Sequence, residues 1–452
     1  MSMGKRKRQR QSEMWVSAAE LPKTPGHPFY QHLNRLLDQH GFDDFVEAEC
    51  ADFYAPTRGR PSVAPGIYFR LLLVGYFEGL SSERGIAWRA ADSLGLREFL
   101  GLNLSESTPD HSTISRTRRL IDVATHDAVF DWVLKRIAQG GLLKGKTIGI
   151  DSTTLEANAA LRSIVRRDSE QGYEEFLTEL AVASGIETPQ REDLAKLDRK
   201  RTGKGSNKQW KHPHDPDARI AKMKDGRTHL AHKAEHAVDL ETGAIVSVRV
   251  QGTDRGDTQT MFETLTEAAE KVEEALPEGS GIKEVVGDKG YHSTERMVDL
   301  EAVGLRSYVS EPKRGKRRWR GDRQAQQAVY ANRRRIRGAR GKRLLRRRGE
   351  LLERPCAHLY ETGGMRRLHI RGRENVLKRL LIQVSAFNLG MLMRQQVGVG
   401  TPRGLQGRLY LLMLLILSLC KRLQGLFGLF PAPRTQKPRS TIPTLLPPVS
   451  SV

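Results

Sequence analysis

Two short apolar segments, each followed at once by an aspartate, constrain this chain more than any other feature of its 452 residues. Residues 149–154 have the sequence GIDSTT and contain Asp151, and residues 285–291 have the sequence VVGDKGY and contain Asp288. Short β-branched apolar runs predict buried strands, so we expect both carboxylates at the ends of neighbouring strands. Taken singly, either aspartate also suits a helix N-cap or a turn, and only the two together favour a shared site.

The segments around these aspartates predict a mixed sheet flanked by helices. Alternating apolar and polar residues at 234–240 and 244–251, on either side of a Glu-Thr-Gly turn, predict a hairpin. The other patterns predict helices at 258–275 and 374–394 and strands at 146–150, 283–287 and 305–309. The order strand, insertion, hairpin, helix, strand is similar to an RNase H-like α/β fold, with a large insertion between its first two strands.

The first third of the chain is expected to be helical. Ser82 can cap a helix that runs to a turn at 94–96, and Thr108, Pro109 and Asp110 predict a further helix start with Thr108 as the N-cap. The helix that follows presents three arginines, Arg116, Arg118 and Arg119. Two interpretations stay open: a helix-turn-helix that contacts DNA, or a basic helix packed within an all-α domain.

The charge of the chain indicates a polyanionic partner. Lys and Arg number 75 against 53 Asp and Glu, a formal net charge of +22, and so basic a chain repels itself unless nucleic acid neutralises it. Between residues 313 and 348 there are 17 Lys and Arg against one acid, Asp322. Such a run is either a solvated face or, if folding brings it near the aspartates, a phosphate-binding surface. Its candidate DNA contacts are Arg333, Arg334 and Arg335.

Paired carboxylates in a basic chain suit phosphodiester chemistry. Two divalent cations about 3.5–4 Å apart activate the attacking oxygen and stabilise the leaving oxygen, and Mg²⁺ prefers carboxylate ligands that are held rigidly. A third acid on a later helix would complete the set, and Glu350 and Glu353 lie one helical turn apart. Beside the second aspartate, Lys289 can contact a phosphate and Tyr291 can stack on a base, unless both are ordinary surface residues.

Other features weaken competing classes of protein. The three cysteines have no short ligand spacing, which argues against a disulfide framework and a cysteine zinc site. The histidines between residues 212 and 236 fit no standard zinc pattern. No apolar stretch follows the basic N-terminus, and the longest apolar run, at 409–420, is shorter than the roughly 20 residues of a membrane span. We therefore expect a cytoplasmic, nucleoid-associated protein that does not enter a membrane.

Five short motifs in this order resemble the DDE transposases of bacterial insertion sequences, and the resemblance covers residues 30–395. The motifs are GIDST at 149–153, DPDAR at 215–219, HKAEH at 232–236, GDKGY at 287–291 and ERP at 353–355, the last followed by MRR at 365–367. The resemblance implies that Asp151, Asp288 and Glu353 bind a pair of Mg²⁺ ions, for which Mn²⁺ can substitute. It also implies binding of terminal inverted repeats by a homodimer, cleavage at the element's ends and joining of the 3′-OH to target DNA.

The third acid departs from the pattern of many relatives, in which Tyr, Arg, Glu and Lys stand at fixed offsets. Arg346 lies four residues before Glu350, as in that pattern. Around Glu353 the Tyr, Arg and Lys positions all differ, but the residues that follow it resemble the subgroup better. Glu353 is therefore preferred, and Glu350 stays as the alternative.

Three hypotheses of function follow. The chain is an active transposase, an RNase H-like nuclease without transposition, or a catalytically silent DNA-binding protein derived from a transposase; candidates for all three acids argue against the last. The expected organisation is a flexible basic arm at 1–28, a helical domain for DNA binding or dimerisation at 29–140, a catalytic domain at 141–396 with an insertion at 160–232 and a basic segment at 313–348, an apolar helical tail at 397–430 and a disordered Pro-rich tail at 431–452.

Overall fold

The computed structural model describes residues 26–55, 62–201, 205–223, 225–279, 281–313, 315, 319, 321–405, 416, 418 and 419. Met1–Gly404 form one compact unit and Leu405–Val452 a second. Most of the expected basic arm, most of the apolar run at 409–420 and the whole Pro-rich tail lie outside the described residues.

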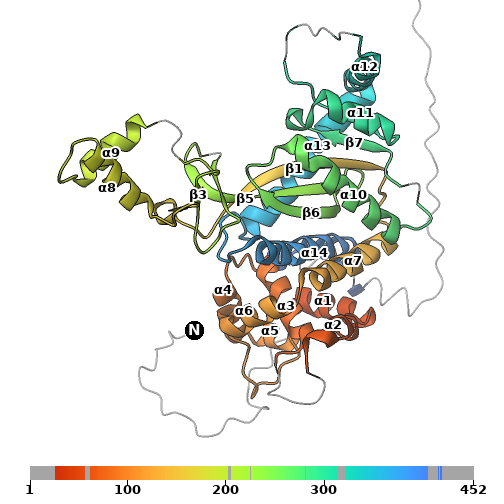
Figure 1. The fold of residues 1–452 in the computed structure, drawn as a ribbon. Helices are drawn as coiled ribbons and strands as arrows, with labels where there is room; N and C mark the ends of the chain where they lie inside the picture. The colour runs from red at the N-terminus through yellow and green to blue at the C-terminus, as the bar shows by residue number, and fades with distance from the viewer. Residues whose placement is uncertain are drawn as a thin grey trace, which may run out of the picture. The chain divides into compact units, whose positions relative to one another are not determined.

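A six-stranded mixed sheet forms the centre of the fold, with the strand order β4-β5-β1-β7-β8 and with β6 also paired to β5 (Figure 1). β1 is antiparallel to β5 and parallel to β7, and β7 is parallel to β8. The strands are β1 (Thr147–Glu156), β4 (Arg219–Lys222), β5 (Thr228–Asp239), β6 (Ile245–Gly252), β7 (Glu284–Gly287) and β8 (Arg306–Val309). This mixed α/β arrangement is RNase H-like, as the order of sequence patterns predicted.

β1 is longer than the sequence predicted, and this changes the position of Asp151. The strand does not end at Asp151 but continues to Glu156, paired throughout with β5, so that Asp151 lies opposite His236. β7 pairs with β1 only from Thr147 to Gly149. Asp288, directly after β7, therefore leaves the sheet beside the middle of β1 rather than beside its end.

Helices cover the two faces of the sheet (Figure 1). Alternate residues of β1 point to opposite faces: Asp151 faces Arg348 of α13, whereas the hydroxyl of Ser152 contacts Asp257 at the start of α10. The helices of this half are α10 (Asp257–Ala275), α11 (Thr294–Ala302), α12 (Arg323–Arg337), α13 (Ala339–Ala357) and α14 (Arg373–Val397). A short 3₁₀ turn, η3 (Lys289–Tyr291), follows Asp288, and a π-helical turn, η4 (His358–Thr362), follows α13.

The N-terminal region is helical, as predicted, but two details differ. Residues 94–99 form a helix, not a turn, because the Ser93 side chain caps it by accepting from Leu96 N. The next helix begins at His111 with Asp110, not Thr108, as its N-cap, since Asp110 accepts from Thr113 N at 2.7 Å. The helices are α1 (Pro28–Gln39), α2 (Phe42–Cys50), α3 (Pro65–Phe77), α4 (Glu83–Ala91), α5 (Leu94–Phe99), α6 (His111–Leu120) and α7 (Val123–Gln139).

α14 joins the N-terminal helices to the sheet. Its buried Arg379 donates to the backbone carbonyl of Leu80 at 3.2 Å, and its Asn388 exchanges two hydrogen bonds with the backbone of Ile245 in β6. Among the residues that the structure describes, one helical stretch, Arg373–Leu405, is long and apolar enough to cross a membrane by length and composition. Its most apolar window is 83% buried inside the fold, which is typical of a core helix.

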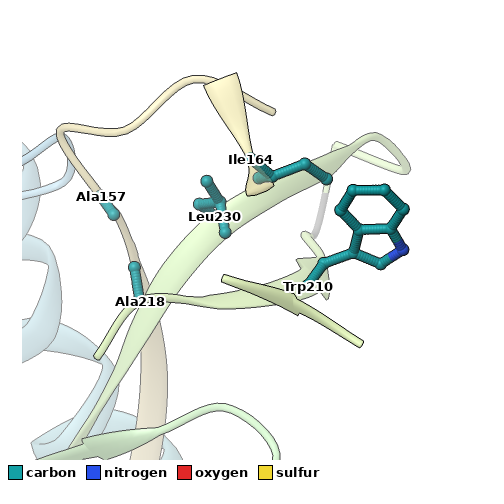
Figure 2. Close-up of a cluster of buried hydrophobic side chains, with 5 residues drawn as sticks. All are labelled: Ala157, Ile164, Trp210, Ala218 and Leu230. Carbon is teal, nitrogen blue, oxygen red and sulfur yellow. The ribbon is translucent and has the colours of Figure 1, made fainter. Parts of the chain in front are cut away.

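The insertion between β1 and β5 has a small hydrophobic core of its own. Trp210 is its largest member and packs edge-to-face on Tyr173, with ring centroids 4.8 Å apart. The buried members are Ala157, Ile164, Trp210, Ala218 and Leu230 (Figure 2). The secondary structure of the insertion is η2 (Leu161–Ser163), β2 (Val165–Arg166), α8 (Tyr173–Ala183), α9 (Arg191–Lys200) and β3 (Trp210–Lys211).

The DPDAR motif connects this insertion to β5 and α14. The buried carboxylate of Asp215 lies 3.1 Å from His232 Nε2 and accepts from Gly372 N at 3.3 Å. Asp217 accepts from Arg373 N at 3.2 Å. The motif therefore holds the first residues of α14 against the edge of the insertion.

Candidate active site

Asp151 and Asp288 meet at one guanidinium group. Arg348 Nη2 lies 3.8 Å from Asp151 Oδ1 and 3.9 Å from Asp288 Oδ2. Burial raises the pKa of Asp151, and the positive charge of Arg348 opposes this rise. Two carboxylates that share a site repel each other, and a cation between them offsets that repulsion. The fold thus brings together two aspartates that are 137 residues apart in the chain (288 − 151).

The loop after β7 explains three residues of the GDKGY motif, Asp288, Gly290 and Tyr291. Asp288 accepts a hydrogen bond from Gly290 N at 2.7 Å and so caps η3. A Cβ atom at Gly290 would lie 2.5 Å from Asp257 Oδ2, a distance that only glycine avoids. Tyr291 is completely buried, and its hydroxyl donates to Glu235 Oε1 at 2.9 Å. Because the ring is buried, the prediction that Tyr291 stacks on a base is wrong. Lys289 is exposed, and its contact with a phosphate stays a prediction.

A buried tyrosine–histidine contact lies on the same face of the sheet as Asp151. His236, which is opposite Asp151 in the β1–β5 ladder, has its Nε2 atom 2.7 Å from Tyr360 Oη. Burial lowers the pKa of His236 to about 4, so the ring is neutral at pH 7. Tyr360 belongs to η4, which means that this contact holds the end of α13 against the strand that supports Asp151.

The third acid does not join the aspartate pair in this structure. Glu350 and Glu353 are both exposed on α13. In the part of the chain that the structure describes, no group of three or more His, Cys, Asp or Glu side chains is arranged to hold a metal ion. Glu353 lies five residues after Arg348 on α13, so its side chain is turned by about 140° from the direction of the aspartates.

The predicted DNA contacts of the N-terminal region divide into buried and exposed residues. Arg118 is buried, and its Nε donates to Glu83 Oε1 at 2.7 Å. A buried ion pair of this kind connects α6 to α4, so the prediction that Arg118 contacts DNA is wrong. Arg116 and Arg119 are exposed on α6.

The basic segment shows the same division. Arg333 makes a bidentate pair with Glu311, at 2.7 and 2.8 Å, and Arg335 donates to the backbone and side chain of Ser307. Both half-buried arginines therefore attach α12 to β8 and the segment after it, whereas Arg334 is exposed, and a contact of these arginines with DNA stays a prediction. Exposed cations also lie on α13, among them Lys342, Arg343 and Arg346.

Three charged residues near the aspartates have functional contacts that no sequence pattern predicted. Lys233 and Glu235 are buried within β5, and Asp257 begins α10. Two of them belong to the HKAEH motif, where charged residues interrupt a strand pattern. This interruption is the sequence feature that could have indicated buried charged residues with a function. Their contacts reach Ser152, next to Asp151, and the loop that follows Asp288.

Two family models match the chain. Residues 18–120 match the family described as Transposase domain (DUF772), and residues 186–389 match the family described as Transposase DDE domain. The second match includes Asp288 and Glu353, whereas Asp151 precedes it. No match is found among curated proteins or among solved structures. The two matched segments, together with the RNase H-like sheet, show that the chain belongs to the DDE transposases of insertion sequences.

Proposed function

We propose that this transposase binds the terminal inverted repeats of its element, cleaves the DNA at the element's ends and joins the resulting 3′-OH to target DNA. The observation that carries the proposal is the convergence of Asp151 and Asp288 on Arg348 where β7 ends beside β1. Both carboxylates are partly exposed, at 26% and 40% of the side chain, so a DNA strand has access to them.

The aspartate pair fits the divalent cations that transposases of this family use. Two carboxylates close to one positive charge are hard oxygen donors of the kind that Mg²⁺ prefers, and Asp151 and Asp288 would hold the metal, with Glu353 as the proposed third ligand. When bound, a pair of Mg²⁺ ions, or Mn²⁺ in their place, lowers the pKa of a water and stabilises the leaving oxygen. The chain itself holds Asp288 in place by the turn at Gly290 and keeps a cation, Lys289, beside it to contact a phosphate.

The proposed function is tested with a supercoiled plasmid that carries the two ends of the element. Incubation with the protein and Mg²⁺ is expected to give nicks or breaks confined to those ends, followed by joined products. Nicks at random positions would indicate a nuclease without transposition, and shifted bands without cleavage would indicate a silent DNA-binding protein. Because two ends must be held together, we also propose a homodimer on DNA, which the same reactions test by cross-linking.

The outer face of α13, which carries the exposed Arg343 and Arg346, is the proposed phosphate-binding surface. Replacing Arg343 and Arg346 by Gln is expected to make the negative slope of log K against log salt shallower by roughly 1 per lost contact. The reason is that each phosphate contact releases counterions. Fluorescence anisotropy with an end duplex between 50 and 200 mM salt measures the slope.

The matched control replaces Arg333 and Arg335, whose side chains contact Glu311 and Ser307 within the fold. This double variant should leave the slope unchanged. If the control flattens the slope and the α13 variant does not, the phosphate-binding surface lies on α12 instead.

A further inference from the structure

A buried carboxylate lies under the loop that carries Asp288. Glu235 of β5 is completely buried and accepts hydrogen bonds from Tyr291 Oη at 2.9 Å, from Thr260 Oγ1 at 2.7 Å and from Thr264 Oγ1. Lys233 Nζ lies 3.6 Å from the same carboxylate. A buried charge is tolerated only when it is paired and hydrogen-bonded, and Glu235 satisfies both conditions with residues from three separate parts of the chain.

The ammonium group of Lys233 connects this buried carboxylate to a second one nearer the surface. Lys233 Nζ lies 2.6 Å from Asp257 Oδ1 and donates to Thr260 Oγ1 at 3.1 Å. The side chain of Lys233 is 6% exposed, whereas that of Asp257 is 29% exposed. The network therefore runs from buried side chains of β5 to the partly exposed start of α10, beside the loop that follows β7.

Asp257 touches the neighbourhood of both aspartates. Ser152, the residue after Asp151, donates to Asp257 Oδ1 at 3.0 Å. The other oxygen of Asp257 fills the space where Gly290 would carry a Cβ atom, and Gly290 N in turn donates to Asp288 Oδ1. Asp257 is thus held between the residue that follows Asp151 and the turn that fixes Asp288.

We propose that Lys233, Glu235, Asp257 and Tyr291 form a positioning network that sets the distance and orientation of Asp288 relative to Asp151 for cation binding. The inference rests on the proposed function, in which these two aspartates hold the metal. The loop from Asp288 to Tyr291 is short and is fixed at both ends, by β7 on one side and by the Tyr291–Glu235 hydrogen bond on the other. Loss of the second attachment frees the loop while leaving both aspartates in the chain.

The decisive variant is Tyr291→Phe, which removes one hydroxyl and keeps the buried ring. The Mn²⁺ affinity of the full-length protein without DNA, measured by calorimetry, is expected to weaken about tenfold. This is the lower end of the loss seen when residues that support metal ligands are changed. The matched control is Tyr308→Phe, because Tyr308 is also buried and donates to a glutamate, Glu284 Oε1, at 3.3 Å, but at the opposite end of β7. Both variants should lose similar thermal stability, and only Tyr291→Phe should lose Mn²⁺ affinity.

A second variant, Ser152→Ala, removes the contact with Asp257 at the half-buried edge of the network and should weaken Mn²⁺ binding in the same direction. Wild-type Mn²⁺ affinity in both Tyr291→Phe and Ser152→Ala would overturn the positioning role while leaving the proposed function intact, provided that Asp288→Asn loses Mn²⁺ binding. If Asp288→Asn binds Mn²⁺ like the wild type, the metal-binding part of the proposed function fails as well.

Discussion

Replacing Asp288 by Asn is expected to lower the rate of DNA cleavage at the element's ends by more than about 100-fold. An amide carries no charge and is a poor ligand for Mg²⁺, and loss of a direct ligand should exceed the roughly 10–100-fold cost of changing its supporting partners. Asp151→Asn should have an effect of the same size, since both carboxylates face the same guanidinium. Single-turnover cleavage of a labelled end measures the rate, and anisotropy should show DNA affinity unchanged or slightly higher, because a negative charge near the phosphates is gone.

The control for this experiment is Asp299→Asn. Asp299 lies 2.7 Å from Arg296 Nη1 on the surface of α11, so the same substitution there removes an ion pair without touching the site. Its cleavage rate should stay within about twofold of wild type, as expected for a surface pair worth less than roughly 1 kcal/mol. Cleavage by Asp288→Asn at the rate of the control would remove Asp288 from the catalytic site.

The parts of the site that depend on local patterns could be predicted from the sequence. The β5–β6 hairpin, the strand before Asp288 and the helix at α14 each have a pattern that is complete within a few residues. The end of β1 could not be predicted in this way. Residues after Asp151 are polar and resemble a helix cap, and only pairing with β5, far along the chain, makes them a strand. Non-local pairing overrides local preference here.

Burial was the second property that the sequence did not reveal. Arg118 and Tyr291 have side chains that are typical of DNA contacts, but their partners, Glu83 and Glu235, lie 35 and 56 residues away. The sequence does not predict a role for the charged residues of the HKAEH motif, because their partners in α10 and in the Asp288 loop come together only in the fold. Residue type suggests chemistry, and the location of partners decides whether that chemistry faces solvent.

The third acid is the point at which sequence pattern and geometry can be tested against each other. Arg348 points at both aspartates, and helical geometry turns Glu350 by about 160° and Glu353 by about 140° from that direction, so neither glutamate points at them. Leu352 lies beside Gly149 of β1, and Tyr360 contacts His236, so these two residues face the sheet. Glu353 is exposed, and Gly349, one turn before it on the same face, has open space where a side chain would be. The assignment of Glu353 as the third acid therefore rests on the sequence that follows it.

With Glu353 as the proposed third acid, Glu353→Gln is expected to reduce end cleavage by more than about 100-fold, whereas Glu350→Gln should change it by less than about threefold. The two variants are matched controls for each other, because both residues are exposed on the same helix and the substitution keeps the shape of the side chain. Each is measured by single-turnover cleavage, with DNA affinity and thermal melting to exclude indirect effects. A large loss in Glu350→Gln alone would assign the third acid to Glu350, in agreement with the position of Arg346 four residues before it. Full activity in both would mean that α13 contributes no acid, and that the metal is held by Asp151, Asp288 and the DNA.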